Sequence, residues 1–106
     1  MRIDISTKNI SLDNPLEVFV NEKIGSLEKF LKNFQDINAK VEIGIPSKHH
    51  RSGKIFYAEA NLKAGGVLFR AQAKDYDLRN AITQVKDELQ IQIKKHKDKY
   101  LATRHQ

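Results

Sequence analysis

Residues 77–101 decide the fold of this chain, and they read DLRNAITQVKDELQIQIKKHKDKYL. Within them, apolar residues recur every three or four positions, at Leu78, Ile82, Val85, Leu89 and Ile93. This spacing places the apolar residues on one stripe of an α-helix. Asp77 suits the N-cap, because its carboxylate can accept a hydrogen bond from an unpaired backbone N–H of the first turn. The stretch therefore predicts one long amphipathic helix, in which His96 and Tyr100 continue the stripe.

The far end of this predicted helix is basic, because lysines crowd the run from Lys94 to Lys99. At about 100° per residue, the basic side chains divide between the two flanks of the stripe: Arg79, Lys86 and Lys97 on one flank, with Lys94 beside them, and Lys95 and Lys99 on the other. Positive charge near the carbonyl end of a helix is favoured by the helix dipole. From this helix alone, a solvated end and a surface for an anionic partner are equally good interpretations.

Alternating apolar and polar residues predict four strands, over residues 2–8, 37–45, 54–63 and 67–74. Gly65-Gly66 supplies the positive φ angles of a tight hairpin turn between the last two strands. The inward positions of these two strands include small residues, which leave room for a helix to pack closely: Ala58, Ala60, Ala71 and Ala73.

A first helix is predicted after the first strand. Asp13-Asn14-Pro15 marks its start, because Asp13 or Asn14 can cap the helix and proline is tolerated at the first helical position. Its apolar stripe is continuous from Leu16 to Phe34 and is widened at its margin by Phe19 and Phe30. Gly25 lies inside this helix at a cost of up to about 1 kcal/mol relative to alanine, so it is a candidate for a close helix–sheet approach.

The element order is therefore β-α-β-β-β-α, which places this chain in the α+β class. Each helix has one apolar stripe and each strand one apolar face, so two layers suffice: a four-stranded mixed sheet with two helices packed on one face. The first two strands are parallel if they are neighbours, and the last three form an antiparallel meander. We expect a single domain over residues 1–106. The plan resembles that of double-stranded RNA-binding domains, which read shape and phosphates.

The amino-acid composition limits which classes of partner this chain can bind. The 106 residues carry a formal net charge of +6, which favours a polyanion such as nucleic acid, or an anionic membrane surface. The absence of cysteine excludes disulfides and thiolate metal sites. The N-terminus lacks the apolar stretch of a signal peptide, and no stretch is apolar for long enough to span a bilayer. We therefore expect a cytoplasmic protein with no membrane partner.

A second basic cluster lies in the loop 48–54, which contains His49, His50 and Arg51. Adjacent histidines alone do not make a metal site, because no third ligand follows at a recognisable spacing. The histidines could be combined with Glu42 or Glu59 into a nuclease, but no spacing requires this. We expect no metal, no cofactor, no small-molecule substrate and no enzymatic activity. The loop is either a solubilising segment or a phosphate contact.

The aromatic residues do not form a platform for stacking bases. Most of the phenylalanines fall on core positions, and only Tyr57 points to the open face of the predicted sheet. An RNA-recognition motif needs several exposed aromatic side chains on its sheet. If the partner is RNA, the helices are therefore expected to contact it through phosphates.

Four segments make the chain resemble the family of short ribosome hibernation promoting factors, ribosome-associated inhibitor A and sigma-54 modulation proteins. They are Ile3-Asp4-Ile5-Ser6, Phe19-Val20 with Lys23 and Leu27-Glu28, Ala71 through Asp77 into Ala81-Ile82, and Gln92-Ile93-Lys94-Lys95-His96-Lys97-Asp98-Lys99. The family's fold is also β-α-β-β-β-α. The resemblance implies binding to the small ribosomal subunit and its ribosomal RNA, in the channel used by mRNA and tRNA. Occupation of that channel would inhibit translation in idle or stressed cells. The protein is expected to be a monomer off the ribosome.

The candidate RNA-binding residues combine this resemblance with charge. They are Lys23, Lys74, Arg79, Lys86, Lys94, Lys95, His96, Lys97, Lys99, His49, His50 and Arg51. The chain departs from the family at Ser26, where many relatives have lysine, and at Glu88 and Ile91, where they often have lysine and arginine. Ile91 lies off the apolar stripe and is expected to be exposed. The middle of the last helix is therefore expected to contact RNA less than in relatives.

Two other functions remain open. The sigma-54 modulation label suggests a protein-binding regulator of transcription, for which an exposed Ile91 would be the anchor. A small nuclease would use His49 or His50.

Overall fold

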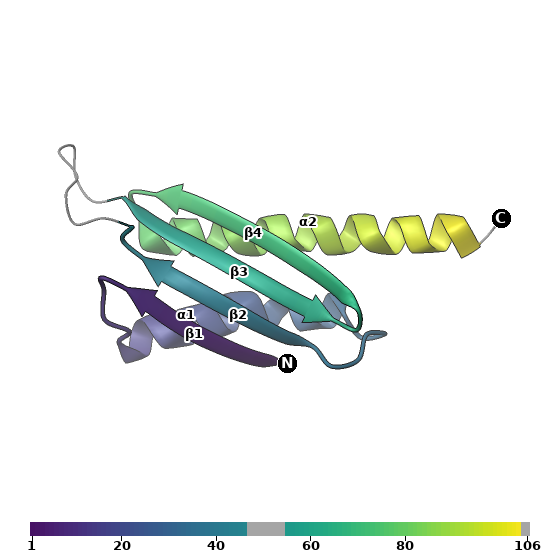
Figure 1. Cartoon of the computed structure of the whole chain (residues 1–106), viewed down its shortest axis with the longest axis horizontal. Coiled ribbons are helices and arrows are strands. Elements are labelled where there is room, and N and C mark those ends of the chain that lie inside the picture. The colour runs from purple at the N-terminus through teal and green to yellow at the C-terminus, as the bar shows by residue number, and fades with distance from the viewer. Residues whose placement is uncertain (47–54, 105–106) are drawn as a thin grey trace.

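The computed structural model describes residues 1–46 and 55–104, with the side chains up to residue 99. Its elements follow the predicted order (Figure 1): β1 (Arg2–Lys8), α1 (Asn14–Gly25), a 3-10 helix η1 (Ser26–Phe30), β2 (Asn38–Gly44), β3 (Phe56–Ala64), β4 (Val67–Asp75) and α2 (Leu78–Arg104). The loop 48–54, with His49, His50 and Arg51, lies outside the described residues.

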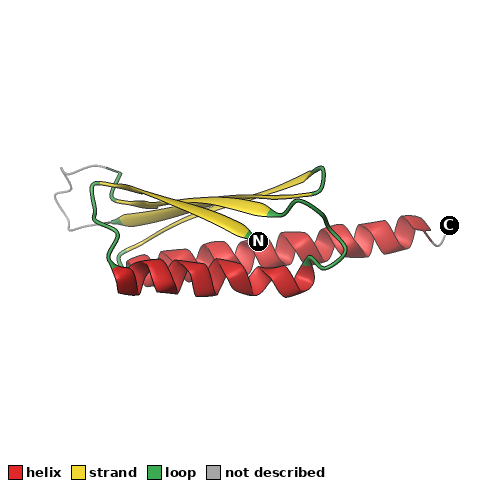
Figure 2. Ribbon diagram, turned by 90° about the horizontal axis from the view of Figure 1, so that it is seen from below, coloured by secondary structure: helices red, strands yellow, loops and turns green. Residues whose placement is uncertain are grey.

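The strands form one sheet in the order β1-β2-β3-β4. β1 pairs with β2 in parallel, and β2, β3 and β4 pair antiparallel. Both helices cover the same face of this sheet, and its other face is open (Figure 2). The predicted two-layer α+β fold is therefore confirmed.

The core lies between the sheet and the helices. The stripe of α2 is buried as predicted, with Ile82, Leu89 and Ile93 fully inaccessible to solvent. From the sheet, Ala58 and Ala60 of β3 face this stripe and are also buried. Small side chains at the centre of the sheet allow the long helix to approach it closely. In Figure 1, the last turns of α2 run beyond the ends of the strands.

The first helix differs from its prediction, because regular α-helix ends at Gly25 and a 3-10 segment follows. The hydroxyl of Ser26 donates to the carbonyl of Lys23 at 2.6 Å, a local bond that competes with continued α-helix. Leu27 and Leu31 are nevertheless fully buried, so the apolar stripe continues through the 3-10 segment. Gly25 does not mark a close approach: a Cβ there would lie 3.9 Å from Ile3 Cδ1, an ordinary contact.

The ends of the parallel strands β1 and β2 are joined tightly. Ile45 N–H donates to the carbonyl of Lys8 at 3.0 Å, and Asn9 Nδ2 donates to the carbonyl of Ile45 at 2.8 Å. At Gly44, a Cβ would lie 2.0 Å from the carbonyl oxygen of Lys8, so this position accepts only glycine without a backbone shift. The close approach that the sequence suggested for Gly25 is found at Gly44 instead.

Candidate nucleic-acid interface

Two of the candidate cations meet on one aromatic ring where α1 and α2 lie together. The ring of Phe19, on α1, has Lys23 Nζ at 5.6 Å and Arg79 Cζ at 4.7 Å from its centroid. Lys23 follows Phe19 by one helical turn, whereas Arg79 comes from the first turn of α2. Such contacts hold a cation over a ring without burying its charge. The pair therefore presents two positive groups to solvent in a defined place.

The caps at the starts of both helices position this pair. Asp13 Oδ1 accepts from the backbone N–H of Leu16 at 2.8 Å at the start of α1. Asp77 Oδ1 accepts from Arg79 N–H at 2.8 Å and from Asn80 N–H at 3.3 Å at the start of α2. Asp77 is thus the predicted cap of α2. Because both helices begin at the same end of the molecule (Figure 2), Phe19 and Arg79 come together.

A shallow hollow of about 470 Å³ lies beside the Phe19 ring. It is lined by Asn14, Pro15, Val18, Phe19, Glu22 and Arg79. Val18 is 53% exposed, so the hollow opens widely to solvent. Its lining combines an apolar floor with one cation and one carboxylate, a set that suits surface contact better than acid–base chemistry.

Further cations follow Arg79 along the same side of α2. Lys86 and Lys97 come after Arg79 by close to whole numbers of helical turns, and we call the side that carries these three residues the α1-facing flank. Lys86 Nζ lies 3.5 Å from Asp87 Oδ1, and its side chain is 23% exposed. Lys97 is half-buried. Towards the end of the helix, Lys94, Lys95 and Lys99 are exposed.

The opposite side of α2 faces β4, and we call it the β4-facing flank (Gln84, Glu88 and Gln92). Gln84 Nε2 donates to Asp75 Oδ2 at 2.9 Å, and Gln92 Nε2 donates to the carbonyl of Arg70 at 2.7 Å. Glu88 accepts from Gln92 at 3.2 Å. This flank is bonded to the sheet and is poorer in positive charge.

His96 packs against the core, as its place on the apolar stripe predicts. Its ring lies 5.9 Å from the ring of Phe34 and 5.7 Å, edge-on, from that of Phe69. The side chain is half-buried. Its role in RNA binding stays a prediction, and these two contacts show that His96 also supports the helix against the sheet.

Lys74 is not brought together with the cations of the helices, because it lies on the open face of the sheet. It pairs across the ladder with Tyr57, and both line a hollow with Lys8 and Glu42. The Tyr57 hydroxyl donates to Glu42. Burial, followed by this hydrogen bond, raises the pKa of Tyr57 to about 12. The one aromatic side chain predicted on the open face is thus held by a carboxylate.

Sequence reasoning missed the role of Phe19, which it assigned to the margin of the core stripe. The spacing of Phe19 and Lys23, four residues apart on a helix, is a signal that predicts their contact. The contact of Phe19 with Arg79 has no such signal, because the two residues meet only after the helices pack.

The described residues contain neither a cluster of metal ligands nor a helix that could span a membrane. Among the described residues, no three His, Cys, Asp or Glu side chains gather as a metal ion would require. No helix within residues 1–46 and 55–104 is long and apolar enough to cross a bilayer.

Ribosome hibernation promotion factors from several bacteria are similar to this chain. The ribosome hibernation promotion factor of Deinococcus radiodurans is 24% identical over 102 residues, which cover 96% of this chain and 52% of that protein. The factor of the same name from Bacillus subtilis is 27% identical over 99 residues, covering 93% of this chain and 50% of that protein. The chain thus spans about half the length of these relatives.

Solved structures agree with the fold, and a family profile covers the sequence. The N-terminal domain of Thermus thermophilus protein Y matches with a TM-score of 0.77 at 26% identity, over 91% of this chain and 99% of that one. A ribosomal subunit interface protein from Coxiella burnetii shares the fold, with a TM-score of 0.67 at 22% identity over 92% of this chain and 99% of that one. Residues 3–101 match the family described as Sigma 54 modulation protein / S30EA ribosomal protein, and this chain therefore belongs to that family.

Proposed function

We propose that this chain is a non-enzymatic ribosome hibernation factor, which binds the small ribosomal subunit in the mRNA and tRNA channel and inhibits translation in idle or stressed cells. The observation that carries the proposal is the row of cations on the α1-facing flank, which continues into the basic end of α2. The names of the relatives from D. radiodurans and B. subtilis support a role in hibernation. The proposed partner is ribosomal RNA, which offers phosphates at many points.

The mechanism is occupancy of the channel. Lys23 and Arg79 hold their charges over Phe19 at one end of the helix pair, and Lys94, Lys95 and Lys97 supply charge at the other. Contacts between such cations and phosphates release condensed counterions, so affinity comes from electrostatics and falls as salt rises. A protein that fills the channel excludes mRNA and tRNA without making or breaking a bond. Inhibition should therefore follow binding directly.

The test compares two triple variants with the same change in charge. In the first, Lys94, Lys95 and Lys97 are replaced by glutamine. In the control, Arg2, Lys40 and Lys63 are replaced by glutamine; these three are exposed and lie on the open face of the sheet, away from the helices. Each variant is co-sedimented with purified small subunits at two salt concentrations.

The first triple variant should bind more weakly and lose part of its salt dependence. Each lost phosphate contact lowers the slope by about 0.9 for duplex DNA and by about 0.7 for single strands. Translation inhibition should weaken in parallel, while the control keeps the parent's slope. If both variants behave alike, only net charge matters and the helix end is not a specific RNA surface.

A second candidate function rests on Ile91, which is 48% exposed as the sequence predicted. An exposed isoleucine on a helix can anchor a protein partner, as a regulator of transcription would require. The two functions differ in their salt response, because an apolar anchor does not depend on counterion release. Ile91→Ala should leave ribosome binding unchanged if the first proposal holds, and should abolish partner binding if the second does.

A further inference from the structure

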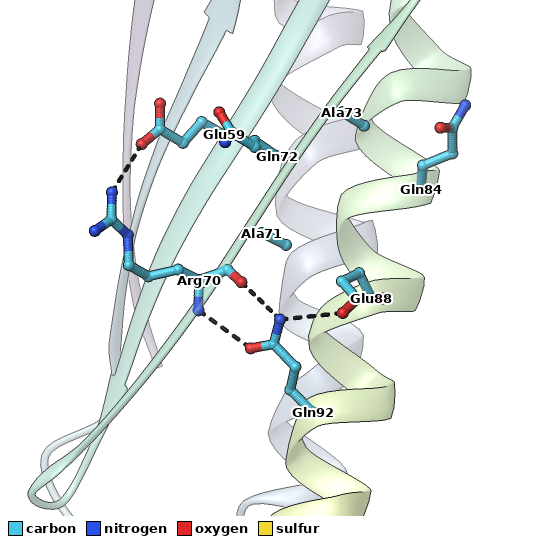
Figure 3. Close-up of a pocket in the computed structure, with 8 residues that line it drawn as sticks. All are labelled: Glu59, Arg70, Ala71, Gln72, Ala73, Gln84, Glu88 and Gln92. Atoms are coloured by element: carbon cyan, nitrogen blue, oxygen red, sulfur yellow. Dashed lines mark hydrogen bonds and ion pairs between the residues drawn. The ribbon is translucent and has the colours of Figure 1, made fainter.

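The free edge of β4 is already bonded to a side chain that imitates a strand. Gln92 Nε2 donates to the carbonyl of Arg70 at 2.7 Å, and Gln92 Oε1 accepts from the Arg70 N–H at 3.3 Å (Figure 3). A neighbouring strand makes this same pair of bonds with one residue of an antiparallel ladder. The amide of Gln92 therefore takes the place of the N–H and C=O that one residue of a fifth strand would present to Arg70.

Two further residues of β4 direct their backbone N–H and C=O groups to this free edge. In an antiparallel strand, alternate residues direct their N–H and C=O groups to the same side, so Gln72 and Lys74 share the free edge with Arg70. A groove of about 680 Å³ follows this edge between β4 and α2. Ala71 and Ala73 are small side chains in its floor, and Gln84 and Glu88 line it from the helix (Figure 3).

The charges around the groove differ between its two sides. On the open face of the sheet, β4 carries Arg70 and Lys74, and Arg70 Nη2 lies 3.6 Å from Glu59 Oε1, so an acidic peptide residue would share Arg70 with Glu59. Glu88 lines the groove on the helix side. A second copy that paired its own β4 here would place like charges opposite one another, which is unfavourable. The complementary occupant is an extended peptide with alternating charge: acidic residues beside Arg70 and Lys74, and basic residues facing Glu88.

We propose that β4 accepts such a peptide from a partner protein as a fifth strand. Strand addition draws affinity from main-chain hydrogen bonds and specificity from alternate side chains. Gln92 leaves Arg70 when the peptide extends past Gln72, and its amide is replaced by the N–H and C=O of one residue of the partner. The peptide would contact β4 and the β4-facing flank, so the proposal does not depend on whether the cations of the α1-facing flank bind the ribosome.

The test uses a defined probe, the acetylated and amidated peptide Thr-Glu-Lys-Thr-Lys-Glu-Thr. Its sequence is the same in both directions, so it suits a parallel or an antiparallel arrangement. The control peptide, Thr-Lys-Glu-Thr-Glu-Lys-Thr, has the same composition with the charges exchanged. Each is titrated up to millimolar concentration into the whole chain while backbone amide signals are recorded by NMR. The probe should shift the signals of Gln72, Lys74 and Gln92. The control peptide should bind more weakly than the probe by at least about threefold.

Variants of the chain test the geometry. Gln72→Pro removes an N–H that faces the free edge without taking a bond from β3, so it should weaken the probe by about tenfold, whereas Gln72→Thr should not. Glu88→Lys should weaken the probe, whereas Asp87→Lys, with the same charge change one position away, should not. If Gln72→Pro does not fold, a probe that is N-methylated at its central threonine tests the same position. This probe lacks the backbone N–H that would bond to Gln72. A probe that leaves the β4 signals unshifted, or binds the proline variant as tightly, overturns the proposal.

Discussion

The two flanks of α2 carry different chemistry although they belong to one helix. The α1-facing flank lies against another helix, whose backbone groups are satisfied internally, so Arg79 can direct its charge to solvent and Lys86 pairs with Asp87 of its own helix. The β4-facing flank lies against a strand edge, whose N–H and C=O groups need partners, and there Gln92 supplies both a donor and an acceptor. The neighbour of each flank thus explains which polar side chains it carries.

The largest expected effect on stability tests how α2 is rotated about its axis, because this rotation decides which residues fall on each flank. Leu89 lies on the stripe between the flanks and is fully buried. Leu89→Ala should lower the free energy of unfolding by about 2–5 kcal/mol, through lost burial and the cavity left behind. Chemical denaturation measures the change, with Ile91→Ala as a control on the exposed side. A parent-like midpoint for Leu89→Ala would mean that the helix is rotated differently.

A smaller effect is expected at the start of α2, which sets the register of both flanks. Asp77 accepts from the N–H groups of Arg79 and Asn80, so Asp77→Ala should cost about 0.5–2 kcal/mol of stability. Asp98→Ala, at the carbonyl end of the same helix, is the matched control and should be neutral or slightly stabilising, because a carboxylate is unfavourable there. Equal effects from the two substitutions would show that Asp77 is not the cap.

The smallest effect concerns the α1-facing flank itself. Phe19 and Arg79 should show a coupling free energy of about 0.5–1 kcal/mol, the range for an exposed contact between a cation and an aromatic ring. A double-mutant cycle of Phe19→Leu and Arg79→Met measures it, and the pair of Phe19 with Lys86 provides a control cycle. Additive effects in the first cycle would remove the argument that the ring positions Arg79.

Much of the fold could be predicted, because burial is written into the sequence as periodicity. The stripe through Leu89 and the alternation in β2 and β4 are local patterns, and each has one solution that removes its apolar residues from water. The N-cap at Asp77 was equally local. Lys74 could also have been placed on the open face, since Ala73 was predicted inward and neighbouring strand residues face opposite sides.

The rest depended on contacts between distant parts of the chain or on a close balance between local hydrogen bonds. Arg79 lies over Phe19 only because α1 and α2 start at the same end of the molecule. Gln92 bonds to Arg70 only because β4 is at the edge of the sheet. The end of α1 at Gly25 reflects a competition between local hydrogen bonds, in which Ser26 bonds to Lys23, and such competitions are close in energy. The sequence pattern carries no direct record of any of these contacts.

The tight join between β1 and β2 has a consequence for the order in which this chain folds. Asn9 and Ile45 bond across 36 residues, whereas β3 and β4 are connected by a short turn at Gly65 and Gly66. Closing a long loop costs more chain entropy than closing a short one, and non-local pairing slows folding. The β3–β4 hairpin and α2 should therefore acquire protection from hydrogen exchange early in refolding, and β1 should dock last. Pulse-labelling that found β1 protected as early as β4 would contradict this order, in which the parallel strand is the rate-limiting closure of the domain.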